Sequence, residues 1–142
     1  MNDAAIESAS VYQRAGGMPF FEKLVDAFYS GVQTDEILAP LYPEAPDFSG
    51  ARHRLTLFLA QYWGGPDLYG QERGNPMLRK RHFPFPVGPL QRDRWLHHMS
   101  SALSSSSADP AVQREMMDYF VRAAEHLRND TGLPISSANY PR

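Results

Sequence analysis

Hydrophobic residues recur at intervals of three and four positions in two stretches of the N-terminal half. The first stretch covers residues 19–33, and its apolar row is Phe21, Leu24, Val25, Phe28 and Val32. The second covers residues 50–63, and its inward row is Ala51, Leu55, Phe58 and Tyr62. This spacing predicts two amphipathic helices, the second capped by Ser49 and ended by Gly64-Gly65-Pro66.

The C-terminal half shows the same helical pattern twice. After Gly88-Pro89 the apolar row is Leu90, Trp95, Met99 and Leu103, and four serines at 104–107 end it. Asp109-Pro110 then supplies a cap and a proline at the first helical position. The row that follows is Val112, Met116, Tyr119, Phe120, Ala123 and Leu127. No stretch alternates as a strand does, so the pattern predicts an all-α fold.

Shorter segments connect these helices. Residues 37–43 are apolar but contain Pro40 and Pro43, which predicts a short helical turn before a loop at 44–50. Residues 67–75 contain Gly70 and Gly74, which predicts a loop before a brief helical piece at 76–82. A chain of 142 residues suits one domain over residues 1–142, with a core at about 11–128 and a flexible tail at 129–142.

Composition narrows the classes of function. The net charge of −2 and the pI near 6.2 give no global basic field, so we expect no nucleic-acid or anionic-lipid partner. The absence of cysteine excludes thiolate catalysis, iron–sulfur clusters and disulfides. The N-terminal residues are acidic without an apolar run, and no segment approaches membrane-spanning length. We therefore expect a cytoplasmic protein without a membrane partner.

One histidine has chemically unusual neighbours. His82 lies between the basic run at 79–81 and the proline-fixed aromatic turn at 83–86. The neighbouring cations disfavour protonation of the imidazole, and only neutral imidazole offers a lone pair to a metal. The prolines end the helix near His82 and stiffen the chain beyond it. On this segment alone, His82 is either a metal ligand or a solvated surface residue.

The other histidines favour no metal site. His97 and His98 are adjacent on a predicted helix, where neighbouring side chains point about 100 degrees apart and do not converge on one ion. We predict both as surface residues. His53 and His126 lie beside the apolar rows rather than on them, so neither suits a ligand role.

Six short motifs occur in order along the chain. They are Gly16-Gly17, Phe28-Tyr29, Leu41-Tyr42-Pro43, Gln61-Tyr62-Trp63-Gly64-Gly65-Pro66, Arg81-His82-x-Pro-Phe and Arg92-Asp93-x-Trp95-Leu96. Together they resemble the truncated haemoglobins, and among these the second group, over about residues 11–127. The resemblance implies a two-over-two helical sandwich around haem b, in which the helices at 19–33 and 50–63 face those at 89–104 and 110–128.

The same resemblance implies roles at the iron. His82 would be the proximal ligand through Nε2, leaving the sixth position free for O2, NO or CO. Tyr29, Tyr42 and Trp95 would form the distal side, where their O–H and N–H groups stabilise bound O2 more than bound CO. Without the resemblance, each of these aromatics would equally suit core packing.

Further residues would contact the haem. The apolar lining would be formed by Phe28, Ala51, Leu55, Phe58, Tyr62 and Phe85. Ala51 stands where many globins place a distal histidine, so a small residue there leaves an open approach to the iron. Arg54 and Arg81 would pair with the haem propionates, with a solvated position as the alternative for either one.

Three functions follow as alternatives. The first is a haem protein that binds O2 tightly, for O2 binding or transport or for detoxification of NO as a dioxygenase, with an electron-donating reductase as partner. The second is a peroxidase-like or sulfide-binding haem protein that uses the same pocket. The third is a haem-free helical interaction module in which His82 and Trp95 are structural.

Overall fold

The computed structural model describes residues 9–78, 81 and 87–128, and every regular element in these ranges is helical. The elements are α2 (Val11–Ala15), α3 (Met18–Val32), the 3₁₀ turn η1 (Ala39–Leu41), α4 (Ser49–Tyr62), α5 (Leu68–Arg73), α7 (Pro89–Ser104) and α8 (Pro110–His126). The all-α prediction is confirmed. The four long helices begin and end within two residues of their predicted bounds.

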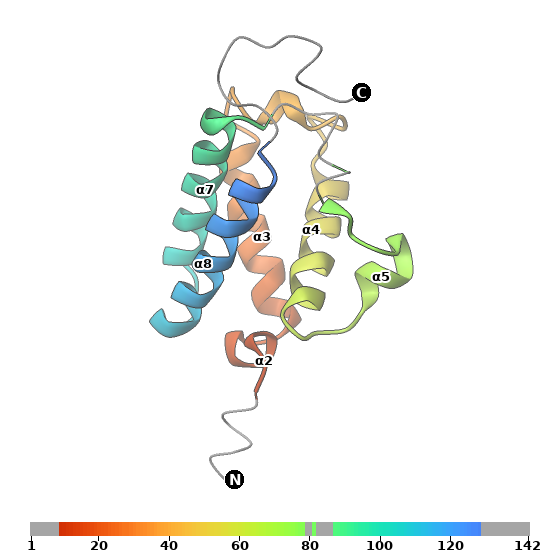
Figure 1. The fold of residues 1–142 in the computed structure, drawn as a ribbon, viewed down its shortest axis with the longest axis vertical. Helices are drawn as coiled ribbons and strands as arrows, with labels where there is room; N and C mark the ends of the chain where they lie inside the picture. The colour runs from red at the N-terminus through yellow and green to blue at the C-terminus, as the bar shows by residue number, and fades with distance from the viewer. Residues whose placement is uncertain (1–8, 79–80, 82–86, 129–142) are drawn as a thin grey trace.

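Helix α3 lies at the centre of the arrangement (Figure 1). It packs against α4 on one side and α7 on the other, while α8 packs against α7. The helices α3 and α4 run in opposite directions, as do α7 and α8, so two antiparallel pairs are stacked through α3 (Figure 1). This is the predicted two-over-two arrangement.

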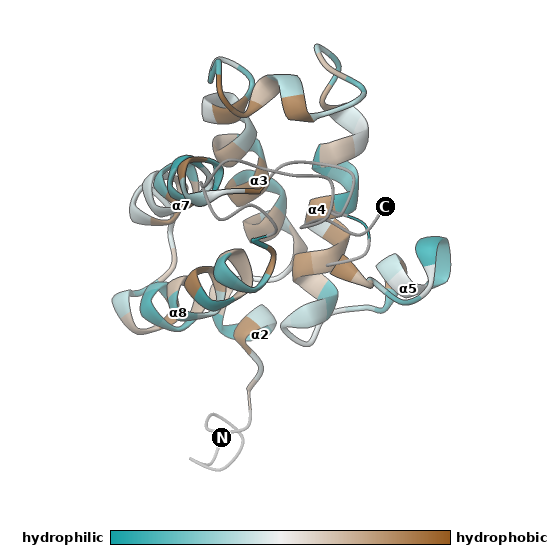
Figure 2. Ribbon diagram, turned by 45° about the horizontal axis from the view of Figure 1, so that its top comes forward, coloured by the Kyte–Doolittle hydropathy of each residue, from teal (hydrophilic) through white to brown (hydrophobic). Residues whose placement is uncertain are grey.

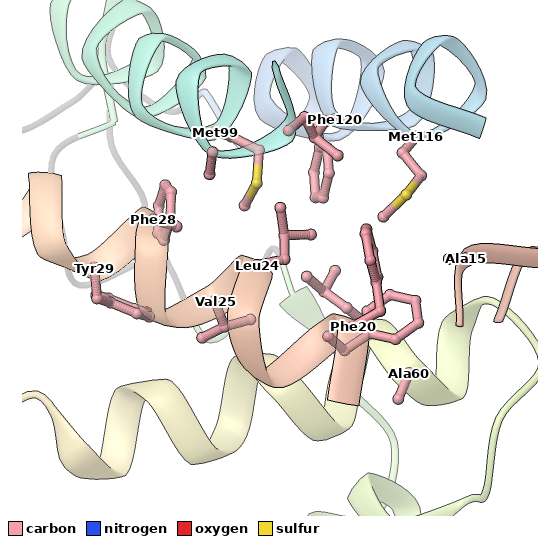
Figure 3. Close-up of a cluster of buried hydrophobic side chains, with 14 of the residues drawn as sticks. Ala15, Phe20, Leu24, Val25, Phe28, Tyr29, Ala60, Met99, Met116 and Phe120 are labelled. Carbon is pink, nitrogen blue, oxygen red and sulfur yellow. The ribbon is translucent and has the colours of Figure 1, made fainter. Parts of the chain in front are cut away.

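The sequence of α3 explains its central position. All five residues of its predicted apolar row are at most 1% exposed. Leu24 and Phe28 point toward Met99 and Phe120 of the second pair, and Val25 points toward α4 (Figure 3). An apolar arc this wide cannot be covered by one neighbouring helix, so α3 needs a partner on each side. Hydrophobic residues accordingly follow much of α3 and part of α4, whereas α5 is largely polar (Figure 2).

The start of α4 differs from the prediction. Ser49 is the first residue of the helix and not its cap. Its backbone N–H and its hydroxyl both donate to Asp47 Oδ1, at 2.9 Å and 2.7 Å. The prediction of Ser49 as cap is wrong because the stronger acceptor, the Asp47 carboxylate, lies two residues earlier.

Helix α5 forms where the sequence predicts a loop. Its one buried side chain, Tyr69, packs edge-on against Phe58 with ring centres 5.6 Å apart. The N–H of Gly70 donates to Gln61 Oε1 at 2.8 Å. These tertiary contacts with α4 offset the low helix propensity of Gly70, which is why local sequence misses the helix.

The glycine pair after α4 allows the N-terminal helix to dock closely. Gly64 has φ of +102°, a conformation that side chains rarely adopt. Gly65 lies directly beneath the Tyr12 ring, and the N–H of Tyr12 donates to the Trp63 carbonyl at 2.9 Å. The first glycine therefore permits the turn and the second permits the close approach of α2.

Replacing Gly65 with alanine is expected to lower the free energy of unfolding by about 1–3 kcal/mol. An added Cβ would lie 2.8 Å from the Ala60 carbonyl oxygen and 2.7 Å from the Tyr12 ring, so backbone or ring must move. Urea unfolding followed by circular dichroism measures the loss. Gly70→Ala is the matched control, because its Cβ would meet nothing closer than Gln61 at 3.5 Å. Equal losses in the two variants would contradict this explanation.

Candidate functional site

Three polar aromatic side chains from separate elements meet at one edge of the core. Tyr29 comes from α3, Tyr42 directly follows η1, and Trp95 lies on α7. The rings of Tyr29 and Tyr42 meet edge-on with centres 5.6 Å apart. The hydroxyl of Tyr29 and the indole N–H of Trp95 are both close enough to the Tyr42 hydroxyl to influence its pKa, and both can act as donors toward its oxygen. The structure thus brings together the three residues that the sequence predicts on the distal side.

Both phenols remain protonated at neutral pH. Burial raises the pKa of Tyr29 well above its usual range, and the charge of Tyr42 and the hydrogen bond to it raise that pKa further. Desolvation also raises the pKa of Tyr42, although the hydrogen bonds from Tyr29 and Trp95 offset part of the rise. Each phenol therefore keeps its hydrogen across the physiological pH range.

Two phenylalanines hold these three residues in place. The Phe48 ring lies 5.9 Å from the ring centre of Tyr29 and 5.3 Å from that of Tyr42. Phe28 is fully buried, with its ring centre 4.9 Å from that of Trp95. Its contacts are with Tyr29 and Trp95, so it supports the polar cluster from the core side.

The predicted pocket row of α4 faces away from the centre of the core. Leu59 and Ala60 are buried, while Leu55 and Phe58 are only partly buried and Tyr62 is 51% exposed. Ala51 is buried in the first turn of the helix. This apolar face of α4 is only partly covered by protein, and hydroxyl and indole donors lie next to it. Such a surface fits a large flat apolar group that carries a polar ligand at its centre. These residues therefore suit a haem.

A cavity lies at the C-terminal end of this face. Its volume is about 370 Å³, and its lining is Tyr62, Leu78, Tyr119, Arg122, Ala123, His126 and Leu127. The ring of Tyr62 lies 4.2 Å from that of Tyr119, whose pKa is raised to about 12 by burial and by the neighbouring Tyr62. Leu78, which lines this cavity, stands four positions before His82 in the sequence.

The predicted metal ligand itself cannot be placed. His82 and Phe85 lie outside the described residues, so their roles stay predictions. Among the described residues there is no group of three or more His, Asp or Glu side chains suited to a metal ion.

The two arginines predicted to pair with propionates have protein partners. Arg54 Nη2 lies 2.7 Å from Glu44 Oε1 in an ion pair that joins α4 to the preceding loop. Arg81 donates from Nε to the Pro76 carbonyl at 2.6 Å, and from Nη2 to the Arg73 and Asn75 carbonyls at 3.1 Å and 3.4 Å. Arg81 therefore closes the turn after α5, and pairing of either arginine with a propionate stays a prediction.

The prediction that both adjacent histidines are surface residues is wrong for His98. His97 is exposed, but the His98 side chain is only 14% exposed, with Nε2 2.7 Å from Asp35 Oδ2. Arg94 reaches the same oxygen from one turn earlier on α7, with Nε at 3.0 Å. A spacing of four residues on one helix face could have indicated a shared partner, but nothing in the sequence identifies Asp35 as that partner.

Asp35 is a buried and fully hydrogen-bonded carboxylate. Burial by itself raises the pKa of this carboxyl, but hydrogen bonds from His98, the Ile37 N–H, Arg94 and the Leu38 N–H outweigh it and hold the pKa well below its usual range. The group is therefore ionised at neutral pH. It joins the turn after α3 to helix α7.

The helical arrangement and the polar cluster together define a globin. The chain belongs to the bacterial-like globin family, whose model matches residues 10–129. Among curated proteins it is similar to the group 2 truncated hemoglobin YjbI of Bacillus subtilis, with 34% identity over 125 residues that cover 88% of this chain and 93% of the relative. It is also similar to the group 2 truncated hemoglobin 3-1 of Lotus japonicus, with 33% identity over 141 residues that cover 98% and 82% of the two chains.

Solved structures agree with this assignment. The hemoglobin of the thermophilic phototrophic bacterium Chloroflexus aurantiacus has a TM-score of 0.82 and 40% identity, covering 86% of this chain and 99% of that chain. The thermostable hemoglobin of the actinobacterium Thermobifida fusca has a TM-score of 0.82 and 43% identity, covering 85% and 98%.

Family membership decides several predictions. The chain has the two-on-two globin fold, its cofactor is haem, typically haem b, and its ligands are small diatomic molecules. This excludes the haem-free interaction module. Within the described residues, no helix has both the length and the apolar character needed to span a membrane.

Replacing Asp35 with asparagine is expected to lower the free energy of unfolding at pH 7 by about 1–3 kcal/mol, because buried donors lose a charged acceptor. The depressed pKa means that the carboxylate stabilises the fold above its unfolded pKa, and that this stabilisation is lost as pH falls. The difference between wild type and Asp35→Asn should therefore be largest near neutral pH and shrink below about pH 4. Urea unfolding over a pH series measures it, and a difference that does not vary with pH would contradict the assignment.

Proposed function

We propose that this protein binds O2 at a haem iron ligated by His82 and holds it long enough for it to react, most directly with NO. The observation that carries the proposal is the convergence of Tyr29, Tyr42 and Trp95 beside the open apolar face of α4. A site built only for an apolar ligand would not need three donors at the edge of the core.

The haem supplies, when bound, a ferrous iron for diatomic ligands, and O2 bound there carries more negative charge than CO. The protein then supplies donors for that charge. With Tyr29 and Trp95 acting as donors toward the Tyr42 oxygen, the hydrogen of Tyr42 is the donor that we propose for the ligand. Acceptance of two hydrogen bonds polarises the Tyr42 hydroxyl and strengthens it as a donor.

The expected strength of the hydrogen bond to the ligand favours reaction of O2 at the site over delivery of O2 elsewhere. A hydrogen bond to a charged acceptor contributes about 1.5–3 kcal/mol, and 1.4 kcal/mol corresponds to about tenfold in dissociation rate. One such bond, from Tyr42, would slow the release of O2 by about ten- to a hundredfold. A protein that releases O2 slowly is a poor carrier and a better catalyst for its consumption.

The haem would supply the iron at which O2 and NO combine to nitrate, and it would need one electron from outside this chain for each turnover. An electron-donating reductase is therefore the proposed partner. A methyl group at Ala51, in place of the distal histidine of many globins, would obstruct a second diatomic molecule less than an imidazole would, which would suit a reaction between two gases.

Replacing Trp95 with phenylalanine is expected to speed O2 dissociation about tenfold, because one donor in the Tyr42 network is lost while the ring volume is largely kept. CO dissociation should change far less. Stopped-flow ligand replacement measures both rates. Trp63→Phe is the matched control, since this tryptophan is buried, whereas Trp95 is partly buried, and its ring contacts Phe21, Tyr119 and Phe120. Unchanged O2 release in Trp95→Phe would refute the donor role.

Replacing His82 with alanine is expected to abolish the five-coordinate spectrum of the ferrous haem protein, because no other proximal nitrogen is proposed. Absorption spectra of the reconstituted protein, with and without O2, test this directly. His97→Ala, at an exposed position, should leave the spectra unchanged. A His82→Ala protein with wild-type spectra would transfer the ligand role to another residue.

A further inference from the structure

Asp35 lies outside the polar cluster but connects the segments that carry it. Its side chain is 1% exposed and stands in the turn after α3. Oδ1 accepts from the backbone N–H groups of Ile37 and Leu38, at 2.8 Å and 3.2 Å. Oδ2 accepts from Arg94 Nε at 3.0 Å and from His98 Nε2 at 2.7 Å. An ionised carboxylate only accepts, so Nε2 of His98 carries the hydrogen.

The two oxygens hold two different parts of the donor cluster. On the Oδ1 side, the capped turn continues through the Ala39 N–H, which donates to the Asp35 carbonyl at 2.9 Å, into η1 and then Tyr42. On the Oδ2 side, Arg94 immediately precedes Trp95, and His98 lies one helical turn further along α7. One carboxylate thus determines the distance between the segment bearing Tyr42 and the helix turn bearing Trp95.

Helix α3 completes the arrangement. A Cβ at Gly31 would lie 2.4 Å from His98 Nδ1, so the imidazole fits against α3 only because residue 31 is glycine. Gly31 follows Tyr29 by two positions on that helix. The His98 ring is therefore fixed between Asp35 and the end of α3 that carries Tyr29.

A role in stability alone explains this arrangement poorly. Removing the Asp35 carboxylate from water costs several kcal/mol, while Arg94 stays 45% exposed, and well-packed apolar residues often stabilise a fold as well as a buried ion pair does. What a buried ion pair adds is a specified geometry. Here the groups that need a specified geometry are the indole N–H of Trp95 and the oxygen of Tyr42.

We propose that Asp35, Arg94 and His98 form a positioning unit that keeps Trp95 in hydrogen-bonding register with Tyr42 and thereby sets the rate of O2 release. None of the three contacts the ligand; they act through Trp95 and Tyr42. The proposal rests on the function proposed above, because it matters only if Trp95 and Tyr42 hold the ligand.

The test compares two variants that disturb the unit by different routes. Asp35→Asn can keep an oxygen for the Ile37 and Leu38 N–H groups but presents a donor to Arg94. Gly31→Ala displaces His98 and leaves the other partners of Asp35 unchanged. In the haem-loaded protein, each is expected to speed O2 dissociation by roughly five- to tenfold, which corresponds to partial loss of one charged hydrogen bond. The C–O stretch of the CO complex should move to higher frequency in both.

Matched controls separate positioning from general loss of stability. Asp109 caps α8 by accepting from the Val112 N–H at 3.0 Å, so Asp109→Asn replaces a charged helix cap with a neutral one, far from Tyr42. Gly70→Ala adds the same methyl group to a helical glycine where the space is open. Both controls should keep the wild-type release rate and C–O stretch, even where Asp109→Asn lowers the melting temperature.

Two more variants distinguish failure of the positioning unit from failure of the proposed function. They are Trp95→Phe and the double variant Asp35→Asn/Trp95→Phe. If Asp35 acts through Trp95, the double variant releases O2 no faster than Trp95→Phe alone. Multiplied effects in the double variant would overturn the positioning role. Trp95→Phe could release O2 faster than wild type while Asp35→Asn and Gly31→Ala release it at the rates of their controls. In that case the positioning unit is refuted and the proposed function stands. If Trp95→Phe itself is unchanged, both fail. If Asp35→Asn does not fold, the same comparison is made with Gly31→Ala and the double variant Gly31→Ala/Trp95→Phe.

Discussion

The two-sided burial of α3 is the constraint on which the rest of the structure depends. Full burial of a large apolar side chain contributes about 1.5–3 kcal/mol, and α3 buries five of them on faces that point in different directions. No single partner helix can cover both faces. The pairs α3–α4 and α7–α8 must therefore stack, and the C-terminal end of α3, with Tyr29, comes to lie between them.

This constraint also explains why polar groups gather at the edge of an apolar core. Tyr29 belongs to the buried surface of α3, so its hydroxyl must find a partner among the elements that cover the helix. Tyr42 and Trp95 provide that partner network, and Asp35 ties the turn before Tyr42 to the helix of Trp95. The residues that meet this requirement are thus the same ones that we propose as donors to the ligand.

Periodicity in the sequence predicts the long helices well because burial of one face is a local pattern. It correctly identifies the buried row of α3, while the motifs, through their resemblance to a family, predict that Tyr29, Tyr42 and Trp95 act together. It does not identify the Asp35–His98 pair, because Asp35 lies in a turn without periodicity and its partners are about sixty positions away. It also misses α5, whose stability comes from Tyr69 packing on Phe58 rather than from local propensity. The expected iron ligand, His82, falls in a segment that the structure does not describe.

The antiparallel pairing of neighbouring helices has a consequence for folding. Helices α3 and α4 are close in sequence, as are α7 and α8, so each hairpin can form through local contacts at little entropic cost. Tyr42 belongs to the first hairpin and Trp95 to the second. The donor network therefore exists only after the hairpins have docked. An intermediate with nearly complete helical content would have no assembled ligand site, so far-ultraviolet circular dichroism would recover before ligand affinity does during refolding.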